Sequence, residues 1–266
     1  PAVGNDKIFQ ALREMQDLAP HFISVTASNN KFDIEETTVR LTEFIANDLK
    51  IPTIAHLPAV YLTKDMVSNI LQSLDRVGVH QILALRGDIF PDVAPKDDFT
   101  FATDLIEYIK TEAPHFDIIG ACYPEGHPDS PNQISDIQNL KKKVDAGCSS
   151  LVTQLFFDNN IFYNFLYRAR EKGISVPIVA GIMPITRAEQ LKRSVAMSGT
   201  EVPQRFRAIV DRFGERKGAM EQAGVIYAAE QIVDLIANGV GHIHVYTMNR
   251  PKIAKAILEQ LSEILD

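Results

Sequence analysis

The 266-residue sequence has no tryptophan, only two cysteines and no excess of basic residues. Two cysteines are too few for a disulfide framework, and Cys122 and Cys148 lie in or beside predicted core segments, so we expect reduced, packed thiols. A formal net charge of -7 argues against broad nucleic-acid binding, which needs a positive field. Local groups must therefore hold any anionic ligand.

Long apolar runs are also absent. None approaches the roughly 20 residues that span a bilayer, and no signal peptide opens the chain. We therefore expect a soluble, cytoplasmic protein with no membrane partner. With 45% hydrophobic residues the chain can bury one large core, and no linker or internal repeat divides it, which predicts a single domain over residues 1–266.

The chain does contain a repeated pattern of short apolar runs that end in polar residues. Strands are predicted near residues 21–27, 52–57, 81–87, 117–124, 150–158, 177–184 and 242–249. Such runs, separated by helical stretches, are typical of parallel strands buried on both faces. Polar groups at their C-terminal ends indicate an α/β fold, a (β/α)8 TIM-type barrel with its site on that face.

Helices are predicted near residues 5–18, 34–49, 63–77, 100–113, 133–146, 159–172, 187–197, 202–212, 217–238 and 251–265. The chain thus starts with a helix and supplies seven strands where a closed barrel needs eight. We expect the first strand to be missing from the given chain. Residues 214–218 are the predicted mobile loop.

The strand ends bring polar side chains to one predicted rim. They are Thr26, His56, Arg86, Gly87, Asp88, Tyr123, His127, Gln154, Met183 and Arg250. Asp88 is the strongest candidate, because a carboxylate can accept hydrogen bonds from a substrate and influence nearby charge. Its ordinary alternative is a helix N-cap after a strand.

A second group lies in the helix predicted at 133–146. Asp136, Asn139 and Lys143 recur at spacings of three and four, which places them along one stripe. Such a stripe can line an adenosine pocket, or it can be a polar outer face. Lys141, Lys142 and Lys143 put three cations together, for a pyrophosphate or for a solvated helix face.

Ordered motifs connect these residues to a known family. ISVT, PTIAHL, ALRGD, ACYPEGHP, LKKKVDAG, TQLFFD, GIMP and HVYTMNR, in this order, closely resemble bacterial-type methylenetetrahydrofolate reductase over essentially the whole chain. The resemblance implies a (β/α)8 fold, bound FAD and ping-pong reduction of 5,10-methylenetetrahydrofolate to 5-methyltetrahydrofolate with NADH or NADPH. It also implies a flavoprotein oxidoreductase of one-carbon metabolism and methionine biosynthesis, commonly a homo-oligomer.

The resemblance also assigns roles to individual positions. It implies FAD contacts at Thr26, His56, Arg86, Gly87, Asp88, Phe101, Ala102, Tyr123, His127, Ser130, Asp136, Asn139, Lys142 and Lys143. It implies folate contacts at Asp88, Gln154, Gln190 and Arg250, with Asp88 as the catalytic residue. The family's general acid, a glutamate in a Phe-Glu-Phe-Phe-Pro-Pro-like motif, has no match after Pro1, and Glu125 matches a different family position.

Each assignment has a simpler alternative. Phe101 can be core, Tyr123 can serve packing only, and His56 and His127 can be histidines bonded to backbone. Gln190 can be an exposed helix residue, and Arg250 a helix N-terminal arginine with no partner, which the helix dipole disfavours.

Three other functions compete with the reductase. A metal-dependent hydrolase is suggested by His242 and His244, which share one side of a strand but lie at its start. A Schiff-base aldolase needs a lysine inside the barrel, and no predicted strand contains one. A catalytically silent folate- or flavin-binding barrel would have lost the first-strand acid. We expect no metal.

Overall fold

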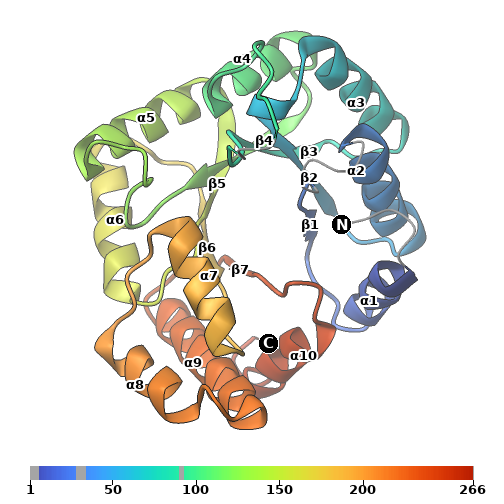
Figure 1. The fold of residues 1–266 in the computed structure, drawn as a ribbon. Coiled ribbons are helices and arrows are strands. Elements are labelled where there is room, and N and C mark those ends of the chain that lie inside the picture. The colour runs from blue at the N-terminus through green and yellow to red at the C-terminus, as the bar shows by residue number, and fades with distance from the viewer. Residues whose placement is uncertain (1–5, 28–33, 90–92, 266) are drawn as a thin grey trace. The chain divides into compact units, whose positions relative to one another are not determined.

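The computed structural model describes residues 6–27, 34–89 and 93–265. These residues contain seven strands: β1 (Ile23–Val25), β2 (Thr53–Pro58), β3 (Gln81–Leu85), β4 (Asp117–Cys122), β5 (Cys148–Thr153), β6 (Ile178–Ile182) and β7 (Ile243–Val245). The strands neighbour one another in chain order (Figure 1). β1 pairs with β2, β2 with β3, β3 with β4 and β6 with β7, each in parallel.

Helices separate the strands along the chain. They are α1 (Asp6–Gln16), α2 (Ile34–Glu43), η1 (Phe44–Asp48), η2 (Ala59–Tyr61), α3 (Lys64–Arg76), α4 (Ala102–Glu112), α5 (Gln133–Asp145), α6 (Asn159–Glu171), α7 (Ala188–Ser198), α8 (Gln204–Phe213), α9 (Lys217–Ala237) and α10 (Pro251–Gln260). The prediction of a TIM-type α/β fold that lacks one strand is confirmed, because parallel strands in chain order with intervening helices are its topology. None of the described helices is both long and apolar enough to cross a bilayer.

Several predicted boundaries were wrong. The strand expected at 150–158 runs from Cys148 to Thr153, because Leu155 and Phe157 are buried in a cluster with α7–α9 side chains instead of continuing the sheet. The loop expected at 214–218 is confined to 214–216, since Gly218 lies inside α9. The last helix ends at Gln260, not near 265.

Contacts within the chain define two compact units. Unit 1 comprises residues 1–121 and 142–151, and unit 2 comprises residues 122–141 and 152–266. Neither cysteine forms a disulfide and both are buried, as expected, and burial raises the pKa of the Cys148 thiol to about 11.

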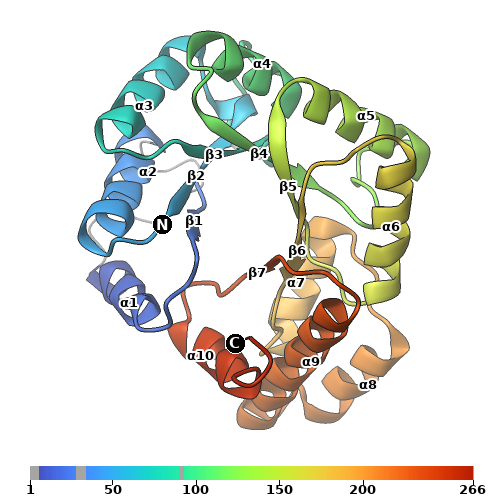
Figure 2. The ribbon, with the colours of Figure 1, turned by 180° about the vertical axis from the view of Figure 1, so that it is seen from behind.

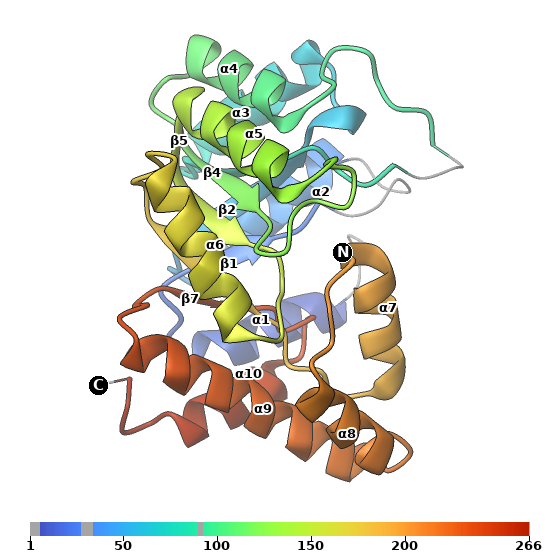
Figure 3. The same ribbon diagram turned by 90° about the vertical axis from the view of Figure 1, so that its left-hand side faces the viewer.

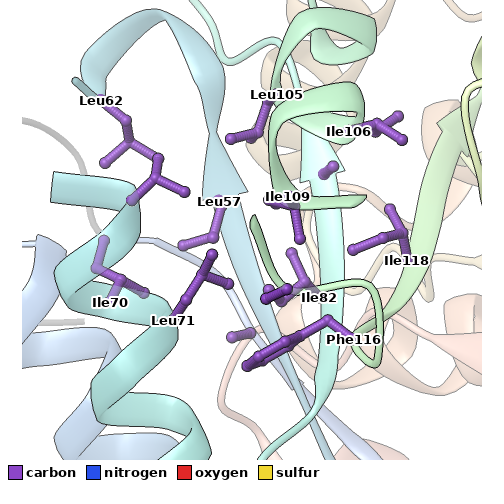
Figure 4. Close-up of a cluster of buried hydrophobic side chains, with 14 of the residues drawn as sticks. Leu57, Leu62, Ile70, Leu71, Ile82, Leu105, Ile106, Ile109, Phe116 and Ile118 are labelled. Atoms are coloured by element: carbon purple, nitrogen blue, oxygen red, sulfur yellow. The ribbon is translucent and has the colours of Figure 1, made fainter. Parts of the chain in front are cut away.

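The core of unit 1 lies between the sheet and the helices that cover one of its faces. Alternate strand residues, Ala55 and Leu57 in β2 and Ile82 and Ala84 in β3, pack with α3 and α4 side chains such as Ile70 and Leu105 (Figure 4). All six are fully buried. Fully burying a leucine or isoleucine side chain contributes roughly 1.5–3 kcal/mol, so this alternation fixes which face of each strand turns to the helices.

The core of unit 2 is built around α9, which packs against α8 and α10 (Figures 2 and 3). Phe206 of α8 and Tyr227 of α9 have ring centroids 4.3 Å apart, and Phe157 lies 5.1 Å from Phe206. The Tyr227 hydroxyl donates to the Phe157 carbonyl at 2.7 Å. The aromatic cluster therefore ties the segment after β5 to two helices of this unit.

His244, in the middle of β7, is a histidine whose protonation the fold alters strongly. Burial lowers the pKa of His244 to about 4, against about 6.5 in an unfolded chain. Between those pH values the unfolded chain binds the extra proton, so the free energy of unfolding falls as pH drops through this window. We expect His244→Gln to flatten this fall, by up to about 1.4 kcal/mol per pH unit.

Urea unfolding at pH 7.0, 6.0 and 5.0 measures this dependence. His21→Gln, a change at an exposed histidine of unit 1, is the control and should keep the wild-type slope. An unchanged slope in His244→Gln would show that other groups cause the acid sensitivity.

Candidate functional site

The C-terminal ends of β1 and β2 place two predicted residues side by side. Val25 pairs with Ala55 and His56 pairs with Leu83, so Thr26 comes beside His56 in the register. Because neighbouring strand residues face opposite sides and Ala55 packs toward the helices, His56 faces the other side of the sheet. That face is the one on which an α/β barrel builds its interior.

The Arg86–Asp88 turn follows β3 and is fixed by the chain after β2. The Val60 amide donates to the Arg86 carbonyl at 3.0 Å, and the Tyr61 hydroxyl donates to the Asp88 carbonyl at 2.7 Å. Gly87 has a φ of +92°, and a Cβ there would lie 2.9 Å from Pro58 Cβ. Glycine is therefore required at this position.

The Asp88 side chain is exposed, and its backbone carbonyl accepts the Tyr61 hydroxyl that helps to hold the turn. The N-cap alternative is wrong, because the next described helix, α4, begins at Ala102. The carboxylate is thus presented at the C-terminal end of β3 on a turn that two hydrogen bonds hold, a suitable place for binding a polar substrate edge.

The start of α4 presents an aromatic ring to solvent. Phe101 is 58% exposed, whereas Ala102 is buried, so Phe101 is not the core residue of the simpler alternative. The Asp104 carboxylate accepts the backbone N–H groups of Thr100 at 2.9 Å and Phe101 at 2.8 Å. These bonds fix the backbone from which the exposed ring projects.

In unit 2, the connection from β4 to α5 gathers four predicted residues. Tyr123 and His127 meet edge-on with ring centroids 4.6 Å apart. Asp136 Oδ1 accepts the His127 N–H at 3.2 Å and the Ser130 hydroxyl at 2.9 Å. Asp136 is only 9% exposed, so it is not part of a polar outer face. Its carboxylate holds the loop that carries His127 and Ser130.

The other members of the α5 group differ from Asp136 in exposure. Asn139 and Lys142 are exposed. Lys143 is partly buried, and its ammonium donates to the Ala121 carbonyl of β4 at 2.6 Å. Lys142 is therefore the more exposed of these two cations.

Gln154 directly follows β5 and lies beside the end of β4. Its backbone N–H donates to the Cys122 carbonyl at 2.7 Å, and its side-chain Oε1 accepts the Leu155 N–H at 2.9 Å. Since the amide oxygen is engaged in this way, the amide NH2 is the group that Gln154 can direct at a ligand as a donor.

Glu125 is a carboxylate near the same strand ends that was not predicted as a site residue. Oε2 accepts the Glu201 N–H at 2.8 Å, and Oε1 is buried without a hydrogen-bond partner among the described residues. Burial raises the pKa of Glu125 above its usual value. The group is therefore easier to protonate than an exposed glutamate, although the exposed Asp88 remains the better-presented carboxylate.

Arg250 and Gln190, far apart in the sequence, meet at Thr186. Arg250 Nη1 donates to the Thr186 hydroxyl oxygen, and that hydroxyl donates to Gln190 Oε1 at 3.3 Å. The Thr186 N–H also donates to Gln190 Oε1 at 3.1 Å, and Gln190 Nε2 donates to the Pro184 carbonyl at 3.2 Å. Gln190 is half-buried, so it is not the exposed helix residue of the simpler alternative. Arg250 has hydrogen-bond partners, so it is not an arginine without a partner.

A second partner of Arg250 is Glu221 of α9, whose Oε2 accepts from Nη2. The side chains of Arg250 and Glu221 are 33% and 39% exposed, so the pair is accessible but oriented by packing. Sequence reasoning missed Thr186 and Glu221. A threonine four residues before Gln190, at the start of a helix, was a signal related to the capping box; nothing in the sequence linked Glu221 to Arg250.

The predicted residues thus form two sets of strand-end groups, one in each unit. Thr26, His56 and Arg86–Asp88 belong to unit 1, and Tyr123, His127, Gln154, Gln190 and Arg250 belong to unit 2. A TIM-type fold with polar residues at the C-terminal ends of its strands defines the class: an α/β protein with the site arrangement of a barrel enzyme.

Comparisons with known proteins identify the family within that class. The methylenetetrahydrofolate reductase family matches residues 2–262, and the chain belongs to this family. The 5,10-methylenetetrahydrofolate reductase of Pectobacterium carotovorum is 31% identical over 256 residues, covering 96% of this chain and 85% of that protein. The Escherichia coli K12 enzyme is 30% identical and is covered to 84%.

Longer relatives match as well. Methylenetetrahydrofolate reductase (NADH) 1 of Arabidopsis thaliana is 31% identical over 279 residues, covering 98% of this chain, and the chain spans 46% of that relative's length. Among solved structures, a Clostridium thermocellum protein described as binding two copies of 5-methyl-5,6,7,8-tetrahydrofolic acid has a TM-score of 0.56 at 15% identity, with 91% of this chain and 94% of that one covered. That likeness shows the shared fold.

Proposed function

We propose that the protein reduces 5,10-methylenetetrahydrofolate to 5-methyltetrahydrofolate with NAD(P)H and that FAD is its cofactor. The observation that carries the proposal is the presentation of Asp88: an exposed carboxylate on a backbone turn fixed by Val60 and Tyr61, within a chain of this reductase family. The pterin of the substrate offers an amino-pyrimidine edge whose N–H groups a carboxylate can accept.

The chemical types of the candidate residues match the parts of a flavin dinucleotide. Unit 1 offers the exposed Phe101 ring for apolar contact and the exposed Lys142 ammonium for a phosphate. Unit 2 offers the His127 and Ser130 loop that Asp136 holds. We propose that these residues hold FAD together with Thr26, His56, Arg86, Gly87, Asp88, Ala102, Tyr123, Asn139 and Lys143. When bound, FAD supplies the hydride-transfer chemistry that no side chain provides.

The protein groups then bind and orient the two substrates in turn, a ping-pong order. Asp88 accepts from the pterin and the Gln154 amide NH2 donates to either substrate, since a donor suits both a nicotinamide carboxamide and a pterin carbonyl. Arg250, oriented by Glu221 and Thr186, pairs with the carboxylates of the folate glutamate tail. Gln190 supports this arrangement through Thr186.

Assays of the full-length protein, including any residues encoded before Pro1, test this function. The purified protein should retain flavin absorbance after dialysis, oxidise NADH or NADPH only when methylenetetrahydrofolate is present, and yield 5-methyltetrahydrofolate by mass spectrometry. Comparison of the two nucleotides decides the preference. Tight folate or flavin binding without product would instead favour the silent binding barrel.

The Glu221 partner of Arg250 leads to a prediction about substrate binding. Glu221→Gln removes the charge that orients the guanidinium, and a partly exposed pair of this kind contributes about 1 kcal/mol. We expect the KM for methylenetetrahydrofolate to rise roughly fivefold, with kcat nearly unchanged, because the folate tail lies away from the reacting atoms. Steady-state kinetics with saturating NADH measures both constants.

The matched control is Glu230→Gln on the same helix. Glu230 pairs with Arg205 on the surface of unit 2, and its loss should leave the KM unchanged. A Glu221→Gln variant with normal KM, or one that loses kcat and thermal stability together, would show that the pair serves only the fold.

A further inference from the structure

Three metal-ligating side chains converge at the N-terminal ends of β3 and β4, the opposite ends from Asp88. Asp75 Oδ1 lies 2.8 Å from His80 Nε2 and 3.1 Å from His115 Nε2. All three ligand atoms lie within 4.8 Å of one another. Among the described residues this is the only group of three or more histidine, cysteine or acidic side chains with such spacing.

The backbone builds this cluster from three separate elements. Asp75 lies in the last turn of α3, and a tight turn through Gly78, with a φ of +75° and an N–H bond to the Asp75 carbonyl at 3.0 Å, brings His80 back over it. The N–H of Asp117 donates to the His80 carbonyl at 2.8 Å, which joins the starts of β3 and β4. His115 is thereby placed next to His80.

A buried ring supports both imidazoles. Phe116 is 1% exposed, and its ring centroid lies 5.5 Å from that of His80 and 4.8 Å from that of His115. The two imidazoles are themselves edge-on at 5.5 Å. Because each histidine packs against a buried core ring, part of the ordering that a bound ligand requires is already present.

We propose that Asp75, His80 and His115 form a binding site for the divalent cation Zn²⁺. Imidazole nitrogen and carboxylate oxygen are ligands that Zn²⁺ binds at about 2.0–2.2 Å. In a tetrahedral site those bonds separate ligand atoms by roughly 3.3 Å, so the two Asp75–histidine distances need to open by only a few tenths of an ångström. The imidazoles bind as neutral Nε2 donors, each with its proton on Nδ1.

The surrounding charges are consistent with a cation in this place. A carboxylate in the last turn of α3 faces the negative end of the helix dipole, and a bound cation offsets that repulsion. Arg76 is adjacent on α3. The Lys110 ammonium is already committed, because it donates to the Phe116 carbonyl at 2.6 Å and to the Pro114 carbonyl at 3.4 Å.

The three ligand side chains are about half exposed, so water completes the coordination shell. The ion links α3 to the starts of β3 and β4.

Calorimetric titration of ZnCl2 into untagged, EDTA-treated protein tests the site. We expect one Zn²⁺ per chain in the wild type, with affinity reduced at least about tenfold in His80→Ala, His115→Ala and Asp75→Asn. His21→Ala, at an exposed histidine of the same unit, should bind like the wild type. Zn²⁺ should also raise the thermal midpoint of the wild type and not that of the three variants.

A second readout locates the ion without substitutions. Long-range ¹⁵N NMR of the histidine rings should show Zn²⁺ shifting Nε2 of His80 and His115 while the resonances of His21 stay in place. Undetectable binding, or binding that all three variants retain at full affinity, would overturn the proposal. So would a shift confined to other histidines. None of these measurements depends on folate, flavin or nicotinamide, so they separate this site from the proposed reductase function.

Discussion

Asp88→Asn is expected to slow the folate-dependent half of the reaction roughly 10- to 100-fold while leaving NAD(P)H oxidation intact or faster. A hydrogen bond to a charged group contributes about 1.5–3 kcal/mol, and the amide replaces one of two acceptor oxygens with a donor. Asparagine is uncharged, so it does not repel the negative charge that accumulates beside residue 88 during NAD(P)H oxidation, as the Asp88 carboxylate does. Only the folate-dependent half of the reaction should therefore become slower.

Separate assays measure the two halves. NAD(P)H oxidation is followed with an artificial quinone acceptor, and the folate half by single-turnover formation of 5-methyltetrahydrofolate. The substitution leaves the turn itself intact, because Tyr61 bonds to the Asp88 backbone carbonyl and not to its side chain. Asp97→Asn, which removes an exposed charge from a nearby segment of the same unit, is the control and should change neither rate.

Two outcomes would contradict this role for Asp88. Equal losses in both halves would indicate that the carboxylate supports the structure of the site. A loss confined to NAD(P)H oxidation would place Asp88 with the nicotinamide and not with the folate.

Among glycine-to-alanine changes at the described glycines, Gly224→Ala is expected to cause the largest loss of stability. A Cβ at Gly224 of α9 would lie 1.8 Å from the Ile185 carbonyl oxygen and 2.7 Å from its carbon, both of them backbone atoms that cannot rotate away. Overpacking a well-filled interior costs typically 1–3 kcal/mol and occasionally more. We expect a loss of about 3 kcal/mol in the free energy of unfolding.

The displacement would also reach the substrate-binding network, because Ile185 directly precedes Thr186, which contacts Arg250 and Gln190. Urea unfolding measures the stability, and the KM for methylenetetrahydrofolate in the folded fraction should rise as well.

The matched control is Gly218→Ala on the same helix. Apart from its chain neighbours and the backbone of its own helix, no described atom lies within 4 Å of a Cβ there. Alanine in a helix is favoured over glycine by about 0.5–1 kcal/mol. A control that loses as much stability as Gly224→Ala would disprove the steric explanation.

Apolar runs in the sequence predict most strands of this fold, but one run also contains buried residues outside the sheet. The apolar runs around Ile82 and Ile118 predicted strands that the structure contains, because residues buried between a sheet and its helices must be apolar at almost every position. The run after Thr153 misled the prediction for the same reason. Leu155 and Phe157 are as buried as strand residues, but they pack with α7–α9 side chains outside the sheet, and hydrophobicity alone does not distinguish the two environments.

The candidate site shows the same division. That Thr26, Tyr123 and Gln154 lie at strand ends followed from the order of the elements, since parallel strands bring their C-terminal ends to one edge. The sequence could not reveal which polar groups were already committed. Asp136 was predicted on a stripe of α5, yet it is buried and bonded to the His127 loop, because a carboxylate satisfies backbone donors that come within reach only after the loop folds.

The sequence by itself therefore determined the class of the fold, the family and the identity of the polar residues that follow the strands. Those features depend on local periodicity and on motifs a few residues long. Only the tertiary structure decided that Glu221 orients Arg250, that Thr186 joins Arg250 to Gln190, and that Asp75, His80 and His115 converge. The Arg250–Thr186, Arg250–Glu221 and Asp75–His115 contacts join segments separated by 29 to 64 residues. Their distances are set by packing between elements, which no local pattern encodes.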